Sequence, residues 1–325
     1  MKKKIAILLG GDSSEYVISE KSGTEIYKIL KDSDYEPFRI RVRNNKWTCI
    51  LDNDKEVELD LNTFRVPVSR GKFLSFDYAF IIIHGTPGED GKVQAILDSH
   101  GIPYNTSGVL SSALSFNKFF CKTYLKSYDI LTPECYLYKK GEDLDIDKII
   151  SVTGLPVFVK PNNGGSSFGT SKVNREEEME HAIEIALKED PEVIIESYVK
   201  GTELSCGLVK TSSESIVFPV TEIATKNEFF DFEAKYTEGI TDEITPARVP
   251  EEVQLRCQKI ASSVYDYLDC RGVVRVDFIL RGNQLYFLEL NSVPGMSRES
   301  IVPKQIRANR MTVIEILEKI IRDSI

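Results

Sequence analysis

The 325-residue sequence is poor in the features that mark disulfide scaffolds, zinc sites and membrane proteins. Its six cysteines include no C-x-x-C pair and no histidine at zinc-ligand spacing, which favours reduced, mostly buried thiols in a cytoplasmic protein. No apolar run approaches the length that crosses a bilayer. The run Ile5–Leu9 behind Met1–Lys4 is too short for a signal peptide, so we expect a buried first strand.

Surplus positive charge is also lacking. Lys and Arg number 41 against 50 Asp and Glu, for a formal net charge of -9 at pH 7. Nucleic acids and anionic membranes bind through surplus Lys and Arg, so we expect neither as a partner. The hydrophobic share of 42% and charged share of 28% are typical of globular proteins, and the length predicts two or three domains.

Alternating strand-like and helix-like segments predict an α/β protein. The apolar runs Lys4–Leu9 and Tyr78–Ile83 indicate buried strands, and Ser14–Leu30 has apolar residues at helical spacing. A helix that Gly101 ends would complete an open α/β domain over residues 1–110.

The rest of the chain predicts a mixed α+β arrangement. Further helices are expected at Ser111–Tyr128, Glu176–Lys188, Glu251–Leu268 and Met311–Ile321, and further strands at Pro156–Lys160, Val193–Val199, Val273–Leu280 and Gln284–Leu290. The last two strands predict a β-hairpin around Arg281–Asn283. The charged, turn-rich stretch Thr225–Glu252 has the length of a functional lid, and we expect its 225–248 part to order with ligands.

The expected hairpin carries the strongest chemical signal. The two-residue period places Arg275 and Asp277 on one face of the first strand, and Glu289 and Asn291 on one face of the second. With a three-residue turn, Asp277 is expected opposite Glu289, and two facing carboxylates repel unless a cation lies between them. Two carboxylates and an amide oxygen suit Mg²⁺ that carries nucleotide phosphates. The alternative is an exposed charged edge on which Arg275 neutralises one acid.

A Gly/Ser-rich loop and a His-Gly segment add weaker signals. Lys160–Gly169 follows a predicted strand and would let backbone N–H groups surround a phosphate, although a plain turn is equally compatible. It matches neither the Walker A nor the Rossmann spacing. His84–Gly91 also follows a buried strand, where ligands of open α/β sheets bind, or else it is a tight turn into a helix. His100 and His181 are expected at the surface.

Seven segments in this order resemble the D-alanine–D-alanine ligase family of ATP-grasp enzymes, over nearly the whole chain. They are Gly10–Glu15, His84–Gly91, Gly101–Tyr104, Lys160–Gly169, Glu233–Tyr236, Arg275–Asp277 and Glu289–Met296. The resemblance implies an N-terminal α/β domain (1–110), a central ATP-grasp lobe (111–200) and a C-terminal lobe (201–325). It also implies that ATP activates one D-alanine as an acyl phosphate, which the amine of a second D-alanine attacks.

The resemblance further implies residue roles. Two Mg²⁺ (or Mn²⁺) ions would be held by Asp277, Glu289 and Asn291. ATP would be bound by Lys118, Lys160, Lys235, Glu196, Tyr198, Val199, Glu203 and Phe229. D-Alanine would be bound by Glu15, His84, Arg275, Gly295, Ser300 and Ile301, with Arg275 and the Gly295 N–H at the oxyanion. Ser166 and Tyr236 would close over the acyl phosphate with Glu15. A homodimer is also implied.

Three positions depart from the family's commonest pattern, namely Tyr16, Asn117 and Gly164. The alternatives to the main interpretation are a D-alanine–D-serine or D-alanine–D-lactate ligase, another ATP-grasp ligase, and a non-enzymatic nucleotide-binding regulator. Tyr236 argues against the lactate version, because ester-forming members tend to replace it. A regulator would need neither Arg275 and Ser300 nor the full set of predicted metal ligands.

Overall fold

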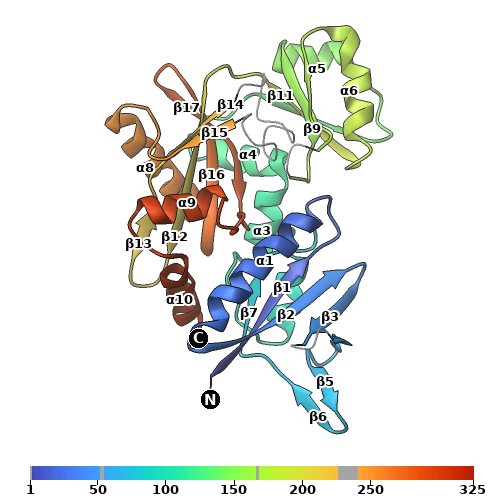
Figure 1. Cartoon of the computed structure of the whole chain (residues 1–325). Helices are drawn as coiled ribbons and strands as arrows, with labels where there is room; N and C mark the ends of the chain where they lie inside the picture. The colour runs from blue at the N-terminus through green and yellow to red at the C-terminus, as the bar shows by residue number, and fades with distance from the viewer. Residues whose placement is uncertain (1, 52–54, 166–167, 226–240) are drawn as a thin grey trace.

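The computed structural model describes residues 2–51, 55–165, 168–225 and 241–325. Its three large sheets each lie in a separate part of the molecule, with the N-terminal domain at the bottom of Figure 1, the central lobe at upper right and the C-terminal lobe at upper left. A hydrophobic core cluster joins the N-terminal and C-terminal parts, because helix α10 (Val313–Ser324) packs Ile316 and Ile320 with Ile5 and Ile7. The mixed α/β class predicted from the sequence is confirmed.

The N-terminal sheet has the order β4-β3-β2-β1-β7, and β1 is parallel to both of its neighbours. Its strands are β1 (Lys3–Gly10), β2 (Tyr35–Arg43), β3 (Lys46–Ile50), β4 (Glu56–Glu58) and β7 (Tyr78–Ile81). A small hairpin and two helices complete this part, namely β5 (Val66–Ser69), β6 (Lys72–Leu74), α1 (Tyr16–Lys31) and α2 (Lys92–Ser99). Strand β1 is buried from Ile5 onward, as expected for a central parallel strand.

The central lobe is a four-stranded antiparallel sheet in the order β10-β9-β11-β8. Its elements are β8 (Cys135–Lys139), α5 (Ile146–Thr153), β9 (Val157–Pro161), β10 (Ser171–Val173), η1 (Glu176–Glu178), α6 (Met179–Ala186) and β11 (Glu192–Ser197). Helices α5 and α6 cover one face of the sheet (Figure 1), and their apolar residues form a core of their own with Val157, Val159 and Val193.

The C-terminal sheet has the order β15-β14-β12-β16-β17, with β13 also paired to β12. Its strands are β12 (Thr202–Lys210), β13 (Ser215–Val217), β14 (Thr221–Thr225), β15 (Thr241–Ile244), β16 (Gly272–Arg281) and β17 (Gln284–Asn291). The helices around it are α3 (Val109–Phe116), α4 (Lys118–Lys126), α8 (Glu251–Tyr267), α9 (Ile301–Ala308) and α10. Cys121 and Leu125 of α4 share a core with this sheet.

Most of the predicted elements are present, with three corrections. The single helix expected over Ser111–Tyr128 is two helices, because Asn117 adopts an extended conformation and its side chain caps α4 by accepting a hydrogen bond from the Phe120 N–H at 2.9 Å. The long stretch Thr225–Glu252 contains a strand, β15, which pairs with β14. The sequence patterns also missed α9 and several strands, including β2, β8 and β12.

The predicted hairpin forms, and Asp277 does lie opposite Glu289. The expected three-residue turn is wrong, since Arg281 pairs with Gln284 and leaves a two-residue connection. Asp277 can still face Glu289 because the register shifts by one residue next to Asp277. Phe278 pairs with Phe287, so Leu288 is the extra residue of a β-bulge. Without it Asp277 would face Leu288, because a one-residue slip exchanges the two faces of a strand.

We expect Gly23→Ala in α1 to destabilise the fold. A Cβ at Gly23 would lie 2.6 Å from Leu9 Cβ, where α1 packs on β1. Alanine favours a helix over glycine by about 1 kcal/mol, whereas overpacking a core costs about 1–3 kcal/mol. The free energy of unfolding in urea should therefore fall. The control is Lys28→Ala on the exposed face of α1, and equal stability of Gly23→Ala and the parent chain would contradict this packing.

Candidate active site

A cleft of about 520 Å³ opens where the three parts of the molecule meet. Residues predicted from the sequence that line it are Glu15, His84, Lys118, Arg275, Glu289, Asn291, Gly295, Ser300 and Ile301. They come from the N-terminal turn, the end of β7, the start of α4, the β16–β17 hairpin and the start of α9. The cleft therefore brings together side chains that are up to 286 positions apart in the sequence.

Glu15 reaches the cleft because of the turn between β1 and α1. Gly10 and Gly11 have φ values of 99° and 101°, which side chains disfavour, and a Cβ on either would lie 2.6 Å from Val42 O or Ile83 Cγ2. The chain then enters α1 directly after Glu15, which is 9% exposed. Its carboxylate lies against Gly165, where a Cβ would lie 2.3 Å from Oε2. Gly165 is therefore required by close packing against this carboxylate, whereas Gly10 and Gly11 are required by the turn that leads to it.

His84 joins the N-terminal domain to the chain that follows β17. Its Nδ1 lies 2.7 Å from the Val293 carbonyl oxygen, and its Nε2 lies 3.4 Å from Ser22 Oγ. A carbonyl only accepts, so Nδ1 carries the proton and Nε2 is the acceptor for Ser22. Burial lowers the pKa of His84, which fits a neutral ring in this position.

Glu89 is a half-buried acid in the wall of the cleft for which no role was predicted. Its carboxylate accepts hydrogen bonds from the Gly85 N–H at 2.7 Å and the Val293 N–H at 3.2 Å. Burial, and then the neighbouring Glu15, raise the pKa of Glu89 to about 7. Glu89 lies within the predicted segment His84–Gly91, but its partner Val293 is 204 residues away and no local pattern reveals it.

The carboxylates of the hairpin are surrounded by positive and polar groups. Arg275 holds Asp277 with two N–H groups, at 2.9 Å to Oδ1 and 2.8 Å to Oδ2. Ser205 Oγ donates to the same carboxylate at 2.6 Å, and Asn291 Nδ2 donates at 3.0 Å. Glu289 lies 3.5 Å from Lys118 Nζ. Arg275 thus neutralises Asp277, as the alternative interpretation expected, but the pair is buried rather than on an exposed edge.

The oxygen-bearing side chains of the hairpin could hold a metal ion only with additional ligands. Among the described residues, no group of three or more His, Cys, Asp and Glu side chains is arranged to hold a metal ion alone. The pair of Asp277 and Glu289, together with the Asn291 amide, provides three oxygen-bearing groups on one face of the hairpin. Mg²⁺ typically keeps several waters and takes only one or two carboxylates beside substrate phosphates. The set therefore suits an ion that arrives with a nucleotide.

The start of α9 closes the cleft opposite the hairpin. Ser300 occupies the N-cap position of α9, and its Oγ lies 2.8 Å from Ser297 Oγ. Gly295 is packed against it, since a Cβ there would lie 2.9 Å from Ser300 Oγ. The first N–H groups of a helix have no partner within the helix and attract anions. This end of the cleft is therefore suited to a carboxylate.

A buried charge cluster lies in the wall between the central lobe and α4. Glu196 on β11 pairs with Lys160 on β9 at 2.7 Å and with Lys122 on α4, whose side chain is fully buried. Burial alone would raise the pKa of Glu196, but the two ammonium groups lower it to about 2. Lys160 was predicted as an ATP-binding residue, whereas Lys122 was not predicted to have any role.

The remaining predicted nucleotide residues lie on the connection between two lobes. Tyr198 and Val199 follow β11, and Glu203 lies near the start of β12. Tyr198 packs edge-on against Phe158, and Lys172 Nζ lies 4.3 Å from its ring centroid. Ser166, Phe229, Lys235 and Tyr236 lie outside the described residues, as does most of the predicted lid.

The positions that depart from the family pattern have structural partners. The guanidinium carbon of Arg43 lies 4.2 Å from the ring centroid of Tyr16. Gly164 borders the cleft, where its carbonyl accepts a hydrogen bond from Lys118 Nζ. Of the other histidines, His181 is exposed as predicted, whereas His100 is half-buried and lies against Phe64.

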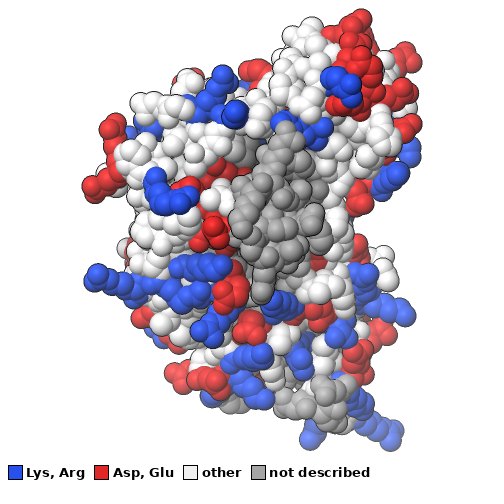
Figure 2. Space-filling view, turned by 45° about the horizontal axis from the view of Figure 1, so that its top comes forward, with Lys and Arg blue, Asp and Glu red and all other residues white. Residues whose placement is uncertain are grey.

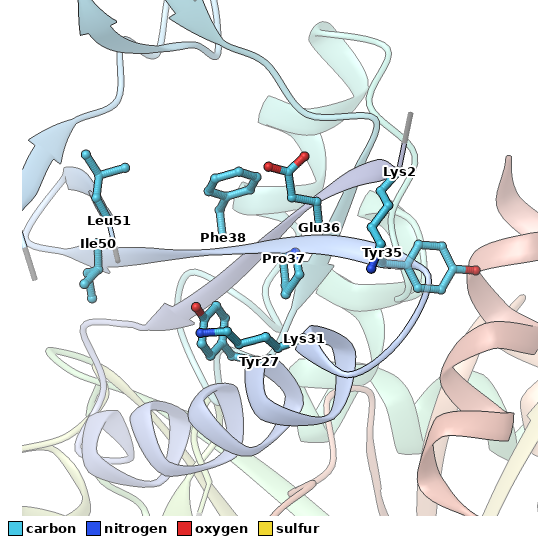
Figure 3. Close-up of a pocket in the computed structure, with 9 residues that line it drawn as sticks. All are labelled: Lys2, Tyr27, Lys31, Tyr35, Glu36, Pro37, Phe38, Ile50 and Leu51. Carbon is cyan, nitrogen blue, oxygen red and sulfur yellow. The ribbon is translucent and has the colours of Figure 1, made fainter. Parts of the chain in front are cut away.

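A hollow of about 590 Å³ beside the cleft is lined by Ser13, Gly85 and Gly164, which come from three of the predicted segments. A second hollow of about 480 Å³ lies between α1 and β2, where Tyr27, Lys31 and Tyr35 contribute to its wall (Figure 3). Figure 2 shows acidic side chains gathered at the tip of the central lobe, over η1 and α6. Among the described residues, no helix combines the length and apolar character needed to cross a membrane.

All six cysteines lack disulfide partners, and only Cys135 is not fully buried. The sequence-based prediction that most of the thiols are buried is therefore confirmed.

Comparison with known proteins agrees with this geometry. Residues 4–107 match the family model described as D-ala D-ala ligase N-terminus, and residues 126–322 match D-ala D-ala ligase C-terminus. The chain is 42% identical over 324 residues to a D-alanine–D-alanine ligase of Phocaeicola vulgatus, covering 99% of each chain. A D-Ala:D-Ser ligase structure from Enterococcus faecalis has a TM-score of 0.88 at 29% identity, covering 99% of each chain. A D-alanine–D-alanine ligase structure from Bacillus anthracis complexed with ATP has a TM-score of 0.78 at 30% identity, covering 99% of this chain and 97% of that one.

The buried charge cluster predicts an order of variant stabilities. Lys122→Met should cost little, below about 1.5 kcal/mol, because its size is similar and Glu196 keeps its pair with Lys160. Glu196→Gln should cost more, about 3–5 kcal/mol, because it leaves two buried ammonium groups without a counter-charge. Urea unfolding of both variants measures the difference, and equal losses would contradict the arrangement.

The same cluster predicts part of the pH dependence of that stability. The pKa of Glu196 falls from 4.5 to about 2 on folding, so its contribution is complete above pH 4.5 and is lost as the pH falls through 2. The parent chain should therefore lose stability more steeply than Glu196→Gln between pH 5 and pH 2. Parallel profiles of the two proteins would contradict the pairing.

Proposed function

The chain belongs to the D-alanine–D-alanine ligase family, and from this premise we propose that its cleft joins two D-alanines into D-alanyl-D-alanine for peptidoglycan precursor synthesis. The enzyme is an ATP-dependent ligase. A carboxylate oxygen of the first D-alanine attacks the γ-phosphate of ATP, ADP leaves, and an acyl phosphate forms. The amine of the second D-alanine then attacks the acyl carbon, and phosphate leaves.

One observation carries this proposal. A single cleft contains a buried carboxylate for an amine (Glu15), a guanidinium beside the reacting centre (Arg275) and a helix start for a carboxylate (Ser300). An amino-acid ligase needs these three elements together, because it must orient two zwitterions against each other. A nucleotide-binding regulator needs none of them.

The first D-alanine is assigned to the Glu15 side of the cleft. The Glu15 carboxylate, which lines the cleft, receives its ammonium group. His84 Nδ1 lies 2.7 Å from the Val293 carbonyl oxygen, so its role is to hold the chain after β17 in place beside this substrate. Glu89 supports the same backbone through the Val293 N–H.

The second D-alanine is assigned to the opposite end. Ser300 and Ile301 at the start of α9 receive its carboxylate, which directs its amine toward the acyl carbon. Arg275 and the Gly295 N–H stabilise the oxyanion that develops there, and such preorganised groups usually make the largest catalytic contribution. Asp277 orients Arg275 through their two hydrogen bonds.

The nucleotide is assigned to the region between the central and C-terminal lobes. Lys118 and Lys160 bind its phosphates, while Glu196, Tyr198, Val199 and Glu203 form the pocket of adenosine. Asp277, Glu289 and Asn291 would hold two Mg²⁺ (or Mn²⁺) ions, which would neutralise the negative charge of the phosphates. Lys235 and Phe229 at the nucleotide, and Ser166 and Tyr236 over the acyl phosphate, retain their predicted roles.

Several broader features belong to the same proposal. We assign residues 1–110, 111–200 and 201–325 to three domains, since each large sheet lies within one of these ranges. We place the enzyme in the cytoplasm as a homodimer, with no nucleic-acid or membrane partner. The resemblance to a D-Ala:D-Ser ligase structure makes D-serine the second candidate acceptor.

The direct test measures phosphate release from ATP and Mg²⁺ with D-alanine alone, and then with added D-serine or D-lactate. We expect release with D-alanine alone and D-alanyl-D-alanine as the main product by mass spectrometry. A dominant mixed product would reassign the acceptor. If ATP binds but no phosphate is released with any D-amino acid, the proposed reaction is wrong and the chain is a nucleotide-binding protein.

We expect Arg275→Ala to lose turnover by on the order of 10²-fold or more, as for a lost oxyanion donor. Ser205 and Asn291 still donate to Asp277 in this variant, so the fold and ATP binding should persist. Thermal unfolding and ATP titration provide those controls. Near-normal turnover would exclude the assigned role of Arg275.

A further inference from the structure

The outer edge of β12 has an interruption in its hydrogen-bond ladder. Strand β14 pairs with Glu203–Ser205 and strand β13 pairs with Leu208–Lys210, so the stretch between Ser205 and Leu208 faces the gap between two short strands. Both Ser205 and Gly207 are buried. A backbone group left without a partner at such a place would be costly, so the gap has to be filled.

The side chain of Gln305 fills this gap. It comes from α9 and is fully buried. Its Oε1 accepts a hydrogen bond from the Gly207 N–H at 3.0 Å, and its Nε2 donates to the Ser205 carbonyl at 2.9 Å and to Thr221 Oγ1 at 3.0 Å. A primary amide offers a donor and an acceptor in one plane, as a peptide group does. Gln305 therefore takes the place of a peptide group of a neighbouring strand.

The part of β12 that Gln305 holds is directly behind the catalytic hairpin. On the other edge of β12, Ser205 pairs with Asp277 and Gly207 pairs with Arg275. Ser205 also donates its hydroxyl to Asp277 at 2.6 Å. A helix turn has about 3.6 residues, so Gln305 lies about one turn after Ile301. The amide thus connects the first turn of α9 with the strand beside Arg275.

We infer that Gln305 is a positioning residue, which sets the distance between the acceptor-carboxylate end of the cleft and Arg275. This inference rests on the function proposed above, because it needs Ser300 and Ile301 to receive the second substrate. Gln305 does not line the cleft. Its effect must therefore be transmitted through the position of α9.

A purely structural role would have a different signature. If Gln305 only stabilises the sheet, its loss should lower every partial reaction together or leave all of them unchanged. If it positions the start of α9, its loss should affect the acceptor that carries a carboxylate and spare one that does not. Hydroxylamine is such an acceptor, because it traps an acyl phosphate as a hydroxamate and has no carboxylate to bind.

The experiment compares D-alanyl hydroxamate formation with D-alanyl-D-alanine formation in Gln305→Glu. This variant keeps the shape and one acceptor but loses the donor. We expect dipeptide formation to fall by about 10-fold to 10²-fold, mainly through the KM of the second D-alanine, as for a small misplacement of a binding group. Hydroxamate formation and the KM of ATP should stay close to those of the parent chain.

Two further variants make the result independent of one substitution. Gly207→Ala perturbs the same contact from the other side, since its Cβ would lie 2.5 Å from Gln305 Oε1, and should give the same split if Gln305→Glu does not fold. Ile306→Val is the matched control, because Ile306 is the next residue of α9, is fully buried and has no polar side-chain group that could bond to β12. It should leave both reactions unchanged.

An equal fall of hydroxamate and dipeptide formation in both perturbing variants would overturn the positioning role, and so would no change in either reaction. A parent chain that forms neither product would instead overturn the proposed function, and with it the basis of this inference.

Discussion

A single extra residue in β17 decides which side chains of the hairpin share a face. Because Leu288 is bulged out of the ladder, Asp277 lies opposite Glu289 and Arg275 lies opposite Asn291. In a regular ladder the carboxylates would lie on opposite faces of the sheet. The hairpin residues assigned to the metal ions and the oxyanion must all lie on one face of the sheet. Bulges often occur beside active sites because they redirect side chains in this way.

The sequence predicted the parts of the site that local patterns encode. Strand periodicity placed Arg275 and Asp277 on one face of the first strand, and the facing of Asp277 and Glu289 is confirmed. The position of the bulge was not predictable, since the apolar run Leu285–Leu288 shows no break. The family resemblance compensated for this, because it assigned Glu289 and Asn291 to one site whatever the register.

Contacts between distant segments could not be predicted from local sequence patterns. Lys122, Glu89 and Gln305 look like ordinary helix or loop residues in the sequence, and their importance lies in partners 74 to 204 positions away. The helix over residues 111–128 was wrong for a related reason. Asn117 has a moderate helix propensity, but capping α4 favours the extended conformation that breaks the helix. Tertiary contacts therefore determine both where the helix is interrupted and which charged side chains are buried.

The contacts of His84 and Glu89 with Val293 have a consequence for how this enzyme varies among organisms. Both contacts are made to main-chain atoms of Val293, its carbonyl and its N–H. Nearly every amino acid supplies these two atoms, and proline alone lacks the N–H. Evolution can therefore change the side chain at 293 without disconnecting the N-terminal domain from the catalytic loop. An alignment of related sequences would therefore show a variable residue at position 293, although the main chain of this residue links two parts of the enzyme.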